Sequence, residues 1–306
     1  MHLLRRPVLA IADRPEVEGL VRRSRLSAGL VRRFIAGEDL DAALDTAGRL
    51  ARLNITSTLD QLGENVGTRE EASAAVGSYT TILERMAEAG LEPNISIKLT
   101  MLGLDVGDDV ARSNAQPILE TARKVGGFVR IDMEGSAYAA RTMTIFGQLH
   151  DAFADEVGIV IQSYLRRAEA DVERLVARRA RVRLVKGAYA EPEAVAFSHR
   201  AEIDGNYRRL LARLLAEGRY PAIATHDPAL IRAAKEIAAT KEIAADRFEF
   251  QMLYGVRRDA QIELVGEGYR LRVYVPFGTQ WYPYFTRRIA ERPANALFVL
   301  RQIISG

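Results

Sequence analysis

The stretch RVRLVKGAY, residues 181–189, is a short run of apolar and charged residues that ends near a glycine. Seven further short apolar runs with polar ends occur along the chain: NITSTLD (54–60), NISIKLT (94–100), FVRIDME (128–134), GIVIQSY (158–164), PAIATHD (221–227), FEFQMLYG (248–255) and LRVYVPFG (271–278). Short runs rich in β-branched residues and bounded by polar residues predict β-strands. We therefore expect eight strands.

Longer stretches with helical spacing separate these runs. Two examples are EEASAAVGSYTTILERMAEAG (70–90) and PEAVAFSHRAEIDGNYRRLLARLLAEG (192–218), each closed by a glycine that is typical of a helix end. Strand–helix alternation implies parallel pairing, and eight such units favour a (β/α)8 TIM-type barrel over an open doubly wound sheet. We expect residues 1–306 to form one domain, with N-terminal helices over 1–47 and the barrel over 48–306.

The N-terminal segment is basic and amphipathic. The stretch VEGLVRRSRLSAGLVRRFIAG (17–37) predicts a helix with an apolar stripe and many arginines. Packing of that stripe on the barrel is the favoured interpretation. Peripheral docking on an anionic membrane surface is the alternative.

The composition excludes several classes of protein. The chain has no cysteine, which rules out disulfides, thiolate catalysis and iron–sulfur clusters. Its net charge of +3 gives no sign of a nucleic-acid partner. The four histidines lack the spacing of common zinc sites, so no metal is expected. Neither a signal peptide nor a membrane span is supported by the sequence, and a cytoplasmic location is expected.

Polar side chains stand at the ends of the predicted strands. In a (β/α)8 barrel the active site forms where the strands end, because the loops that follow them meet at one face. The residues at these ends are Asp60, Lys98, Asp132, Glu134, Gln162, Arg183, Lys186, Thr225, His226, Gln251 and Tyr274. We expect them to line one polar pocket at the barrel mouth.

The stretch YVPFGTQWYPYFTRRIAERPAN, residues 274–295, places two adjacent arginines on the predicted last helix, which should begin near Thr279. Helical spacing brings Arg287 and Arg288 to the same side as Tyr284 and Glu291. Such a cluster is either a solvated ion pair or a clamp for a small carboxylate, since a guanidinium group binds a carboxylate with two parallel hydrogen bonds.

The ordered set of motifs resembles the proline dehydrogenase family. The motifs are S-I-K-L-T, R-I-D-M-E, I-Q-S-Y, R-L-V-K-G-A-Y, A-T-H, E-F-Q-M-L-Y-G, Y-V-P-F-G and W-Y-P-Y-x-x-R-R-x-x-E-R-P-A-N, between about residues 54 and 300. The resemblance is to the short bacterial monofunctional form. It implies oxidation of L-proline to Δ1-pyrroline-5-carboxylate, with hydride transfer from proline C5 to N5 of FAD and a membrane quinone as electron acceptor.

The resemblance also implies roles for individual residues. The implied substrate contacts are Lys98, Tyr274, Tyr284, Arg287 and Arg288, with Glu291 holding the arginines in position. The implied catalytic residues are Asp132 and Arg183, with Arg183 directed at N5. The implied FAD contacts are Met133, Gln162, Arg183, Val185, Lys186, Gly187, Ala188, Thr225 and His226. Ala190 departs from relatives that carry an aromatic residue there, and the acceptor of the proline amine proton is left open between water and Asp132.

Two other classes of function remain open at the level of sequence. A Schiff-base aldolase built on the same barrel would use Lys98 or Lys186 as its nucleophile. A non-catalytic amino-acid-binding barrel would keep the two adjacent arginines and bind no flavin. The absorption spectrum of the purified protein discriminates between these classes and a flavoenzyme.

Overall fold

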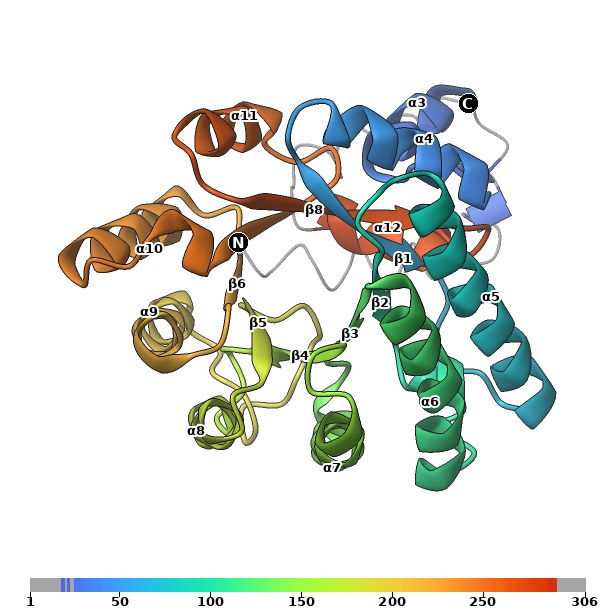
Figure 1. Cartoon of the computed structure of the whole chain (residues 1–306), viewed down its shortest axis with the longest axis horizontal. Helices are drawn as coiled ribbons and strands as arrows, with labels where there is room; N and C mark the ends of the chain where they lie inside the picture. Colours follow the sequence, from blue (N-terminus) through green and yellow to red (C-terminus); the bar gives the residue numbers. More distant parts are fainter. Residues whose placement is uncertain (1–17, 20, 23–24, 291–306) are drawn as a thin grey trace.

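Eight parallel strands close into a barrel in the computed structural model, which describes residues 18–19, 21–22 and 25–290 (Figure 1). Each strand pairs with the next in chain order, and β8 returns to pair with β1 along six residues, from Thr56 opposite Arg272 to Gln61 opposite Phe277. The predicted (β/α)8 barrel is confirmed.

The strands of the barrel are β1 (Thr56–Gln61), β2 (Asn94–Ile97), β3 (Phe128–Ile131), β4 (Val157–Gln162), β5 (Arg181–Val185), β6 (Ala222–Ala224), β7 (Glu249–Leu253) and β8 (Leu271–Phe277). The helices are α3 (Arg25–Phe34), α4 (Leu40–Ala51), α5 (Arg69–Glu88), α6 (Asp108–Val125), α7 (Ser136–Ala152), α8 (Ala168–Ala177), α9 (Arg200–Glu217), α10 (Pro228–Thr240), α11 (Arg258–Gly266) and α12 (Tyr282–Ala290). The described residues also contain two 3₁₀ turns, η2 (Thr100–Leu102) and η3 (Ala245–Arg247).

Every predicted run contains a strand. The polar residues of four runs follow the ends of β2, β3, β5 and β6 and belong to the loops at the mouth of the barrel: Lys98, Asp132, Lys186 and Thr225. Those of the other four runs lie within β1, β4, β7 and β8: Asp60, Gln162, Gln251 and Tyr274. Residues 192–199, which we expected to be helical, form a loop instead, and α9 begins only at Arg200. This loop is held by a bridge between Leu165 and Ala196. The last helix begins at Tyr282 rather than near Thr279.

The helix α5 illustrates how local sequence sets the ends and the buried face of a helix. Thr68 caps its first turn through a reciprocal pair of hydrogen bonds with Glu71. Tyr79, Leu83 and Met86 follow at helical spacing and are buried. The apolar face of α5 thus packs on the barrel, as periodicity requires.

The interior of the barrel is polar, whereas its outer layer is apolar. Successive side chains of a strand point to opposite faces. On β5, Val182 and Leu184 belong to the apolar core, while Arg183 reaches across the barrel to Gln251 and Ser96. The core of this protein therefore lies mainly between strands and helices, and the space inside the strands holds charged groups.

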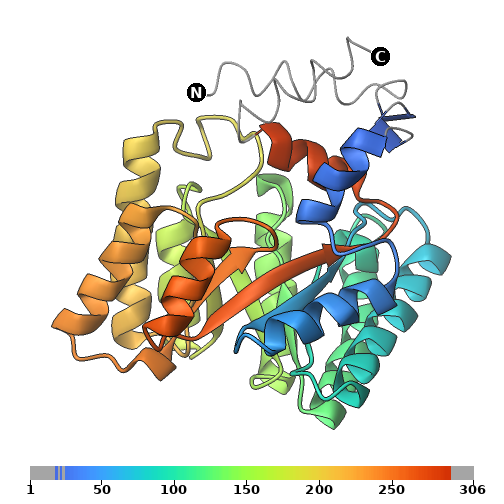
Figure 2. The same ribbon diagram turned by 90° about the horizontal axis from the view of Figure 1, so that it is seen from above.

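The helices α3 and α12 lie together near the end of the barrel at which the strands finish (Figure 2). A second apolar cluster forms there from Val21, Phe34, Ile35, Leu62, Val256, Trp281, Tyr282, Tyr284 and Phe285. Gly255 has a φ of +73°, and a Cβ at this position would lie 1.7 Å from the carbonyl oxygen of Arg33. Only glycine lets the end of α3 approach the loop after β7 so closely.

Candidate active site

A cavity of about 500 Å³ opens at the mouth of the barrel. Its walls come from the ends of the strands, from the loop after β5 and from α12. The predicted site residues in its wall are Lys98, Asp132, Met133, Gln162, Arg183, Val185, Lys186, Gly187, Ala188, Thr225, His226, Tyr274, Tyr284, Arg287 and Arg288. The structure brings these fifteen residues together. Glu291 lies outside the described residues.

Lys98 lies at the bottom of this cavity between two carboxylates. Its ammonium group donates to Oδ1 of Asp60 at 2.8 Å and lies 3.9 Å from Oδ2 of Asp132. Burial opposes a charge here, but the two carboxylates hold the pKa of Lys98 well above its usual value. Lys98 is therefore a cation at neutral pH.

Asp132 accepts a hydrogen bond at each of its carboxylate oxygens. Arg183 donates from Nη1 at 2.9 Å, and the hydroxyl group of Tyr274 donates at 2.8 Å. Burial, together with the Asp132 charge, raises the pKa of Tyr274 well above its usual value, so the phenol keeps its proton. The guanidinium carbon of Arg183 also lies 5.2 Å from the centre of the Tyr274 ring. These contacts fix the three side chains relative to one another.

Arg183 is also held by a residue deeper inside the barrel. Its Nε donates to Oε1 of Gln251 at 2.5 Å, and Gln251 in turn donates to Glu249. Glu249 accepts from Nε of Arg272 at 3.1 Å. All four residues are at most 4% exposed. A buried chain of hydrogen bonds therefore runs along the barrel axis from the mouth toward the opposite end.

The helix α12 contributes the two predicted arginines, but their surroundings differ. Arg287 donates to Oε1 of Glu64 at 2.9 Å. Burial lowers the pKa of the Arg287 guanidinium group, but the charge of Glu64 outweighs this effect, so the pKa is raised above its usual value. The guanidinium carbon of Arg288 lies 5.4 Å from the ring centre of Tyr284. Both arginines are half-buried and line the cavity.

The part of the cavity wall near the ends of β4 and β5 offers uncharged polar groups. Gln162 donates to the carbonyl oxygen of Met133 at 2.9 Å, while its buried Oε1 has no hydrogen-bond partner within the described part of the chain. Gly187 has a φ of +123°, and a Cβ there would lie 2.3 Å from the ring of Tyr164. The backbone after β5 can therefore pack this closely on the ring of Tyr164 only because residue 187 is glycine.

Lys186 and the loop after β6 lie beside this wall. The ammonium group of Lys186 pairs with Asp204 at 2.5 Å and with Asp227 at 2.8 Å. Burial opposes the charge of Asp227, yet the hydrogen bond from Lys186 lowers the pKa of that carboxyl to about 2. Thr225 accepts from the backbone amide of Asp227, and Nε2 of His226 accepts from the amide of Leu253 at 2.9 Å.

Several residues of the site were not assigned from the sequence. Asp60 and Gln251 were noted only as polar strand ends. Glu64, Tyr189, Asp204 and Asp227 were not singled out at all, although Glu64 follows the first predicted strand by only four residues. Glu134, in contrast, lies outside the lining of the cavity and accepts from the hydroxyl and amide groups of Thr100.

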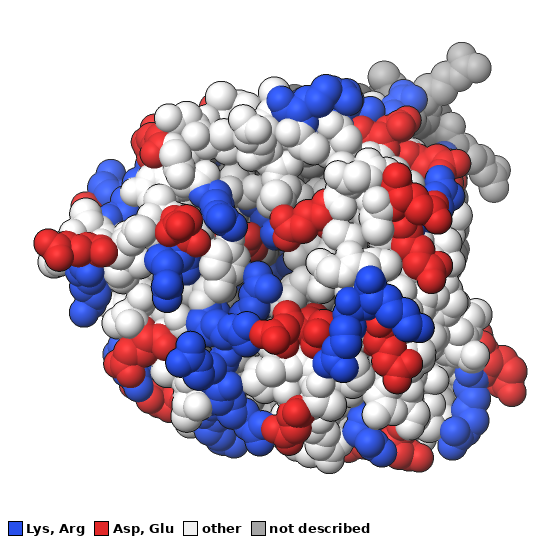
Figure 3. Space-filling model, in the orientation of Figure 1, with Lys and Arg blue, Asp and Glu red and all other residues white. Residues whose placement is uncertain are grey.

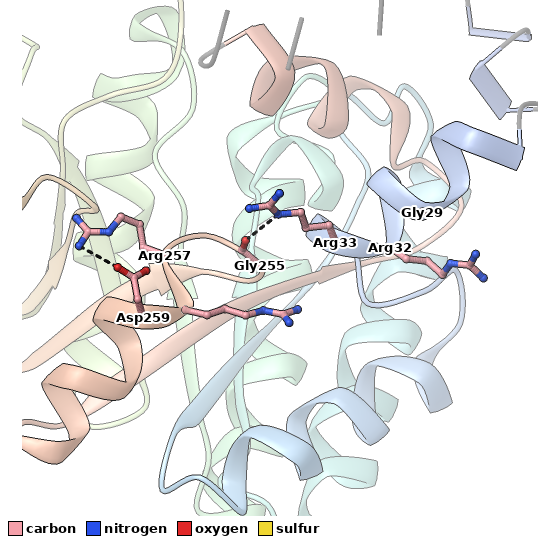
Figure 4. A pocket seen from close by; sticks show the side chains of 7 residues that line it. Gly29, Arg32, Arg33, Gly255, Arg257 and Asp259 are labelled. Atoms are coloured by element: carbon pink, nitrogen blue, oxygen red, sulfur yellow. Dashed lines mark hydrogen bonds and ion pairs between the residues drawn. The ribbon is translucent and has the colours of Figure 1, made fainter. Parts of the chain in front are cut away.

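A second hollow, of about 700 Å³, lies between α3 and the loop after β7 (Figure 4). Arg33 points to the carbonyl oxygen of Gly255 and Arg257 points to Asp259, whereas Arg32 points away from both pairs. The charged groups here do not converge on one point. We therefore place the chemistry at the barrel mouth rather than in this larger hollow.

None of the described helices combines the length and the apolar character needed to cross a membrane. The basic residues Arg32 and Arg33 at the end of α3 are exposed.

Comparison with known proteins identifies the family. The model of the family described as proline dehydrogenase matches residues 43–301. The chain is 42% identical over 309 residues to proline dehydrogenase of Deinococcus radiodurans, covering 100% of this chain and 99% of that protein. It is also 42% identical over 273 residues to proline dehydrogenase 1 of Bacillus subtilis strain 168, covering 89% and 90% respectively.

A solved structure gives the same result. The crystal structure of proline utilization A (PutA) from Bdellovibrio bacteriovorus, inactivated by N-propargylglycine, matches with a TM-score of 0.81 at 28% identity, over 87% of this chain. The match covers 33% of that protein, so this chain spans about a third of its length. With the barrel, the site and these relatives considered together, the chain belongs to the proline dehydrogenase family.

Proposed function

We propose that this protein oxidises L-proline to Δ1-pyrroline-5-carboxylate with FAD as its cofactor, as one domain that includes the N-terminal helices. The observation that carries the proposal is the single cavity in which Lys98 and the Asp132–Arg183–Tyr274 cluster face the arginines of α12. A small zwitterion such as proline needs both a cationic partner for its carboxylate and a shaped, partly apolar space for its ring.

The residues of the β4–β5 wall fit a flavin. The buried Oε1 of Gln162 offers an acceptor for an N–H donor such as the flavin imide, and no described residue uses it. Gly187 allows close backbone approach, and Lys186 offers a cation for the pyrophosphate. We propose Met133, Gln162, Val185, Gly187 and Ala188 as contacts of the flavin and ribityl chain, with Lys186, Thr225 and His226 near the phosphates. FAD, when bound, supplies the hydride acceptor.

Lys186 must share its charge with two carboxylates of this chain. An incoming phosphate would therefore meet a lysine whose charge is already partly compensated. We infer that Asp204 and Asp227 hold the ammonium group in place, and that backbone amides of the loops after β5 and β6 supply further donors to the phosphates.

The carboxylate of proline is proposed to bind Arg287 and Arg288, which both line the cavity. Arg287 also pairs with Glu64, which fixes the direction of its donors. Lys98 adds a positive charge at the bottom of the cavity. Tyr274 and Tyr284 would pack on the pyrrolidine ring and exclude water, and Glu291 keeps its proposed role as a partner of the arginines.

The amine proton of proline must leave before or during hydride loss. Asp132 is poorly suited to accept it, because Arg183 and Tyr274 already donate to both of its oxygens. We therefore favour water as the proton acceptor, with Asp132 orienting Arg183. Arg183 would then lie beside the reacting atoms as a fixed positive charge.

The Schiff-base alternative has no support in this site. A lysine nucleophile requires a lowered pKa so that its amine is neutral. The pKa of Lys98 is raised instead, by Asp60 and Asp132, and Lys186 pairs with two carboxylates. Neither lysine has the surroundings of an aldolase nucleophile.

The electron acceptor is proposed to be a membrane quinone, with the protein in the cytoplasm. The exposed arginines of α3 are the candidate contacts with an anionic membrane surface. Vesicles with and without anionic lipid would test this part separately.

The absorption spectrum of the purified protein tests the main proposal. We expect a flavin band that bleaches when L-proline is added without oxygen and returns when a soluble quinone is added. A protein that binds proline but never bleaches, even after reconstitution with FAD, would be a non-catalytic binder and would overturn the proposal. Arg208→Gln, on an exposed part of α9, serves as a variant that should bleach like the wild type.

A further inference from the structure

A third cavity lies at the opposite end of the barrel, where the strands begin. It has a volume of about 410 Å³. Figure 3 looks onto this end and shows a hollow near the centre, with Lys and Arg side chains gathered beside it. Four arginines line the cavity, together with two glutamates and a tyrosine: Arg181, Arg219, Arg270, Arg272, Glu92, Glu249 and Tyr220. We call it the floor cavity.

Both glutamates of the floor cavity pair with the same arginine, Arg272. Arg272 donates from Nε to Glu249 at 3.1 Å and from Nη2 to Glu92 at 2.7 Å. The carboxylate of Asp155 pairs with Arg219 from outside the lining. Among the described residues no carboxylate forms an ion pair with Arg181 or Arg270, although Glu249 lies close enough to act on the charge of Arg181, and Asp246 and Glu92 on that of Arg270. The lining still carries four arginines against two glutamates, so positive charge is in excess.

Arg181 has a buried hydrogen-bond donor without an acceptor in the described part of the chain. Its guanidinium carbon lies 4.1 Å from the ring centre of Phe128 and 4.9 Å from that of Tyr220. Its Nε is buried and has no hydrogen-bond acceptor among the residues that the structure describes. The two rings hold the guanidinium group in place, yet leave its in-plane donors unused, because contacts to a ring face engage only the flat side.

A second buried arginine, Arg130, also has a hydrogen-bond donor without an acceptor in the described part of the chain. Arg130 is 2% exposed, and within the described residues it donates hydrogen bonds to backbone oxygens only, those of Ile159 and Arg181. Its Nε has no partner within the described residues. Burial and the nearby charges of Arg183 and Arg181 lower the pKa of Arg130 well below its usual value. A negative charge in the floor cavity would relieve this repulsion.

The backbone conformation of Tyr220 is energetically unfavourable. It has a φ of +46° and precedes Pro221, a setting in which non-glycine residues rarely adopt a left-handed conformation. The conformation presents the ring to Arg181 and places the hydroxyl group 3.4 Å from Nη1 of Arg270. Such conformations persist where the surrounding structure imposes them and are concentrated at functional sites.

We propose that the floor cavity binds a small polyvalent oxyanion, with phosphate as the simplest member of the class. Arg181 and Arg270 would donate to its oxygens, while the hydroxyl group of Tyr220, which donates to Oε2 of Glu249 and accepts from Arg270, would hold Arg270 in place. The volume suits a small molecule rather than a polymer. This site is separate from the proposed proline and FAD sites at the mouth, and the inference holds whether or not the proposed function is correct.

Calorimetric titration of the FAD-loaded protein with inorganic phosphate tests the proposal, against sodium chloride at equal ionic strength. FAD loading keeps phosphate out of the cofactor site. We expect saturable binding of phosphate and none of chloride. Arg181→Gln and Arg270→Gln should each weaken binding at least about tenfold, because a hydrogen bond to a charged group is lost. Arg270 is exposed, so its variant should fold even if Arg181→Gln does not.

Two controls assign the binding to the floor. Arg208→Gln removes the same charge from an exposed position of α9 and should bind phosphate like the wild type. Arg288→Lys alters only the mouth and should also leave phosphate binding intact. Binding that survives Arg270→Gln but is lost in Arg288→Lys would place the anion at the mouth and overturn the proposal. An absence of saturable binding in the wild type would overturn it as well.

Discussion

The two ends of this barrel hold buried arginines and lysines in different ways. At the mouth, Lys98 faces Asp60, Arg183 faces Asp132, and Arg287 faces Glu64. At the floor, Arg272 takes both glutamates of the cavity lining, while Arg181 is held by two aromatic rings.

This difference separates two uses of a buried cation. A carboxylate that accepts from an arginine fixes the direction of its donors, which a site for directed chemistry requires. An arginine held only by aromatic rings keeps its in-plane donors available for a ligand. The mouth therefore has the character of an oriented reaction site, and the floor that of a site for an anion. The following predictions test each side of this contrast, in order of expected effect.

Glu249→Gln should have the largest effect, on stability. It leaves the Arg272 guanidinium, 3% exposed, without its buried counter-charge. Breaking one side of a buried ion pair costs about 3 to 5 kcal/mol. The free energy of unfolding in urea, measured on the FAD-loaded protein, should fall by this amount.

Glu120→Gln on the exposed face of α6 is the matched control and should stay within about 0.5 kcal/mol of the wild type. The double variant Glu249→Met/Arg272→Met should recover much of the loss, because neither buried charge of the pair remains and Glu92, which loses Arg272, is half exposed to water. A loss of less than about 1 kcal/mol in Glu249→Gln would show that the floor pair is not effectively buried.

Arg288→Lys should have the largest effect on substrate binding. Lysine keeps the charge but loses the planar pair of donors, so the KM for proline should rise by roughly 30- to 1000-fold, or about 2 to 4 kcal/mol. FAD content should stay normal. Steady-state kinetics with a quinone acceptor would measure this.

Pyrrolidine, which lacks a carboxylate, is the matched ligand. Its weak binding or turnover should be almost unchanged in Arg288→Lys. Equal impairment with both ligands would mean that Arg288 supports the structure of the site rather than the carboxylate of proline, and that α12 carries an ordinary ion pair.

Tyr274→Phe should have an intermediate effect. It removes the hydroxyl group that donates to Asp132 at 2.8 Å and keeps the ring beside Arg183. The ratio kcat/KM for proline should fall about tenfold, as expected for a lost hydrogen bond to a charged group. An unchanged ratio would show that Arg183 alone orients Asp132. Tyr138→Phe, whose hydroxyl group donates to Asp105 near the protein surface, is the control and should behave like the wild type.

The smallest predicted effect concerns Asp227, at the rim of the mouth. The pKa of this carboxyl is lowered to about 2, so its pairing with Lys186 stabilises the fold above its unfolded-state pKa of about 4. That stabilisation is lost as the pH falls through about 2. The stability gap between the wild type and Asp227→Asn should be about 1 kcal/mol near pH 6, after solvent screening, and should narrow by pH 3. A gap that does not change with pH would contradict the pairing.

The fold and much of the site could be predicted from the sequence for identifiable reasons. Each strand is a compact apolar run, and the polar residue after it marks the mouth, as Lys98 and Asp132 show. The partners of these residues were harder to predict. Glu64 lies in the loop after β1 and meets Arg287 from 223 positions away, a contact that only closure of the barrel creates.

The polar interior of the barrel also could not be predicted from the local sequence pattern. Strands of a parallel barrel are buried on both faces, so alternation along Arg181–Val185 does not say which residues point inward. Asp204 is a further example, because it stands in the first turns of α9 and meets Lys186 only through the packing of that helix on the loop after β5. Such pairings depend on the three-dimensional arrangement of distant segments.

The chain of hydrogen bonds along the barrel axis also bears on how the protein is made. Arg272 and Tyr274 both lie on β8, and β8 is synthesised last of the eight strands. Until it emerges from the ribosome, Glu249 has no guanidinium partner and Asp132 lacks the tyrosine hydroxyl group. A nascent chain that ends before β8 would have to leave water around these carboxylates. The interior of the barrel can therefore exclude solvent only after translation has passed its final strand.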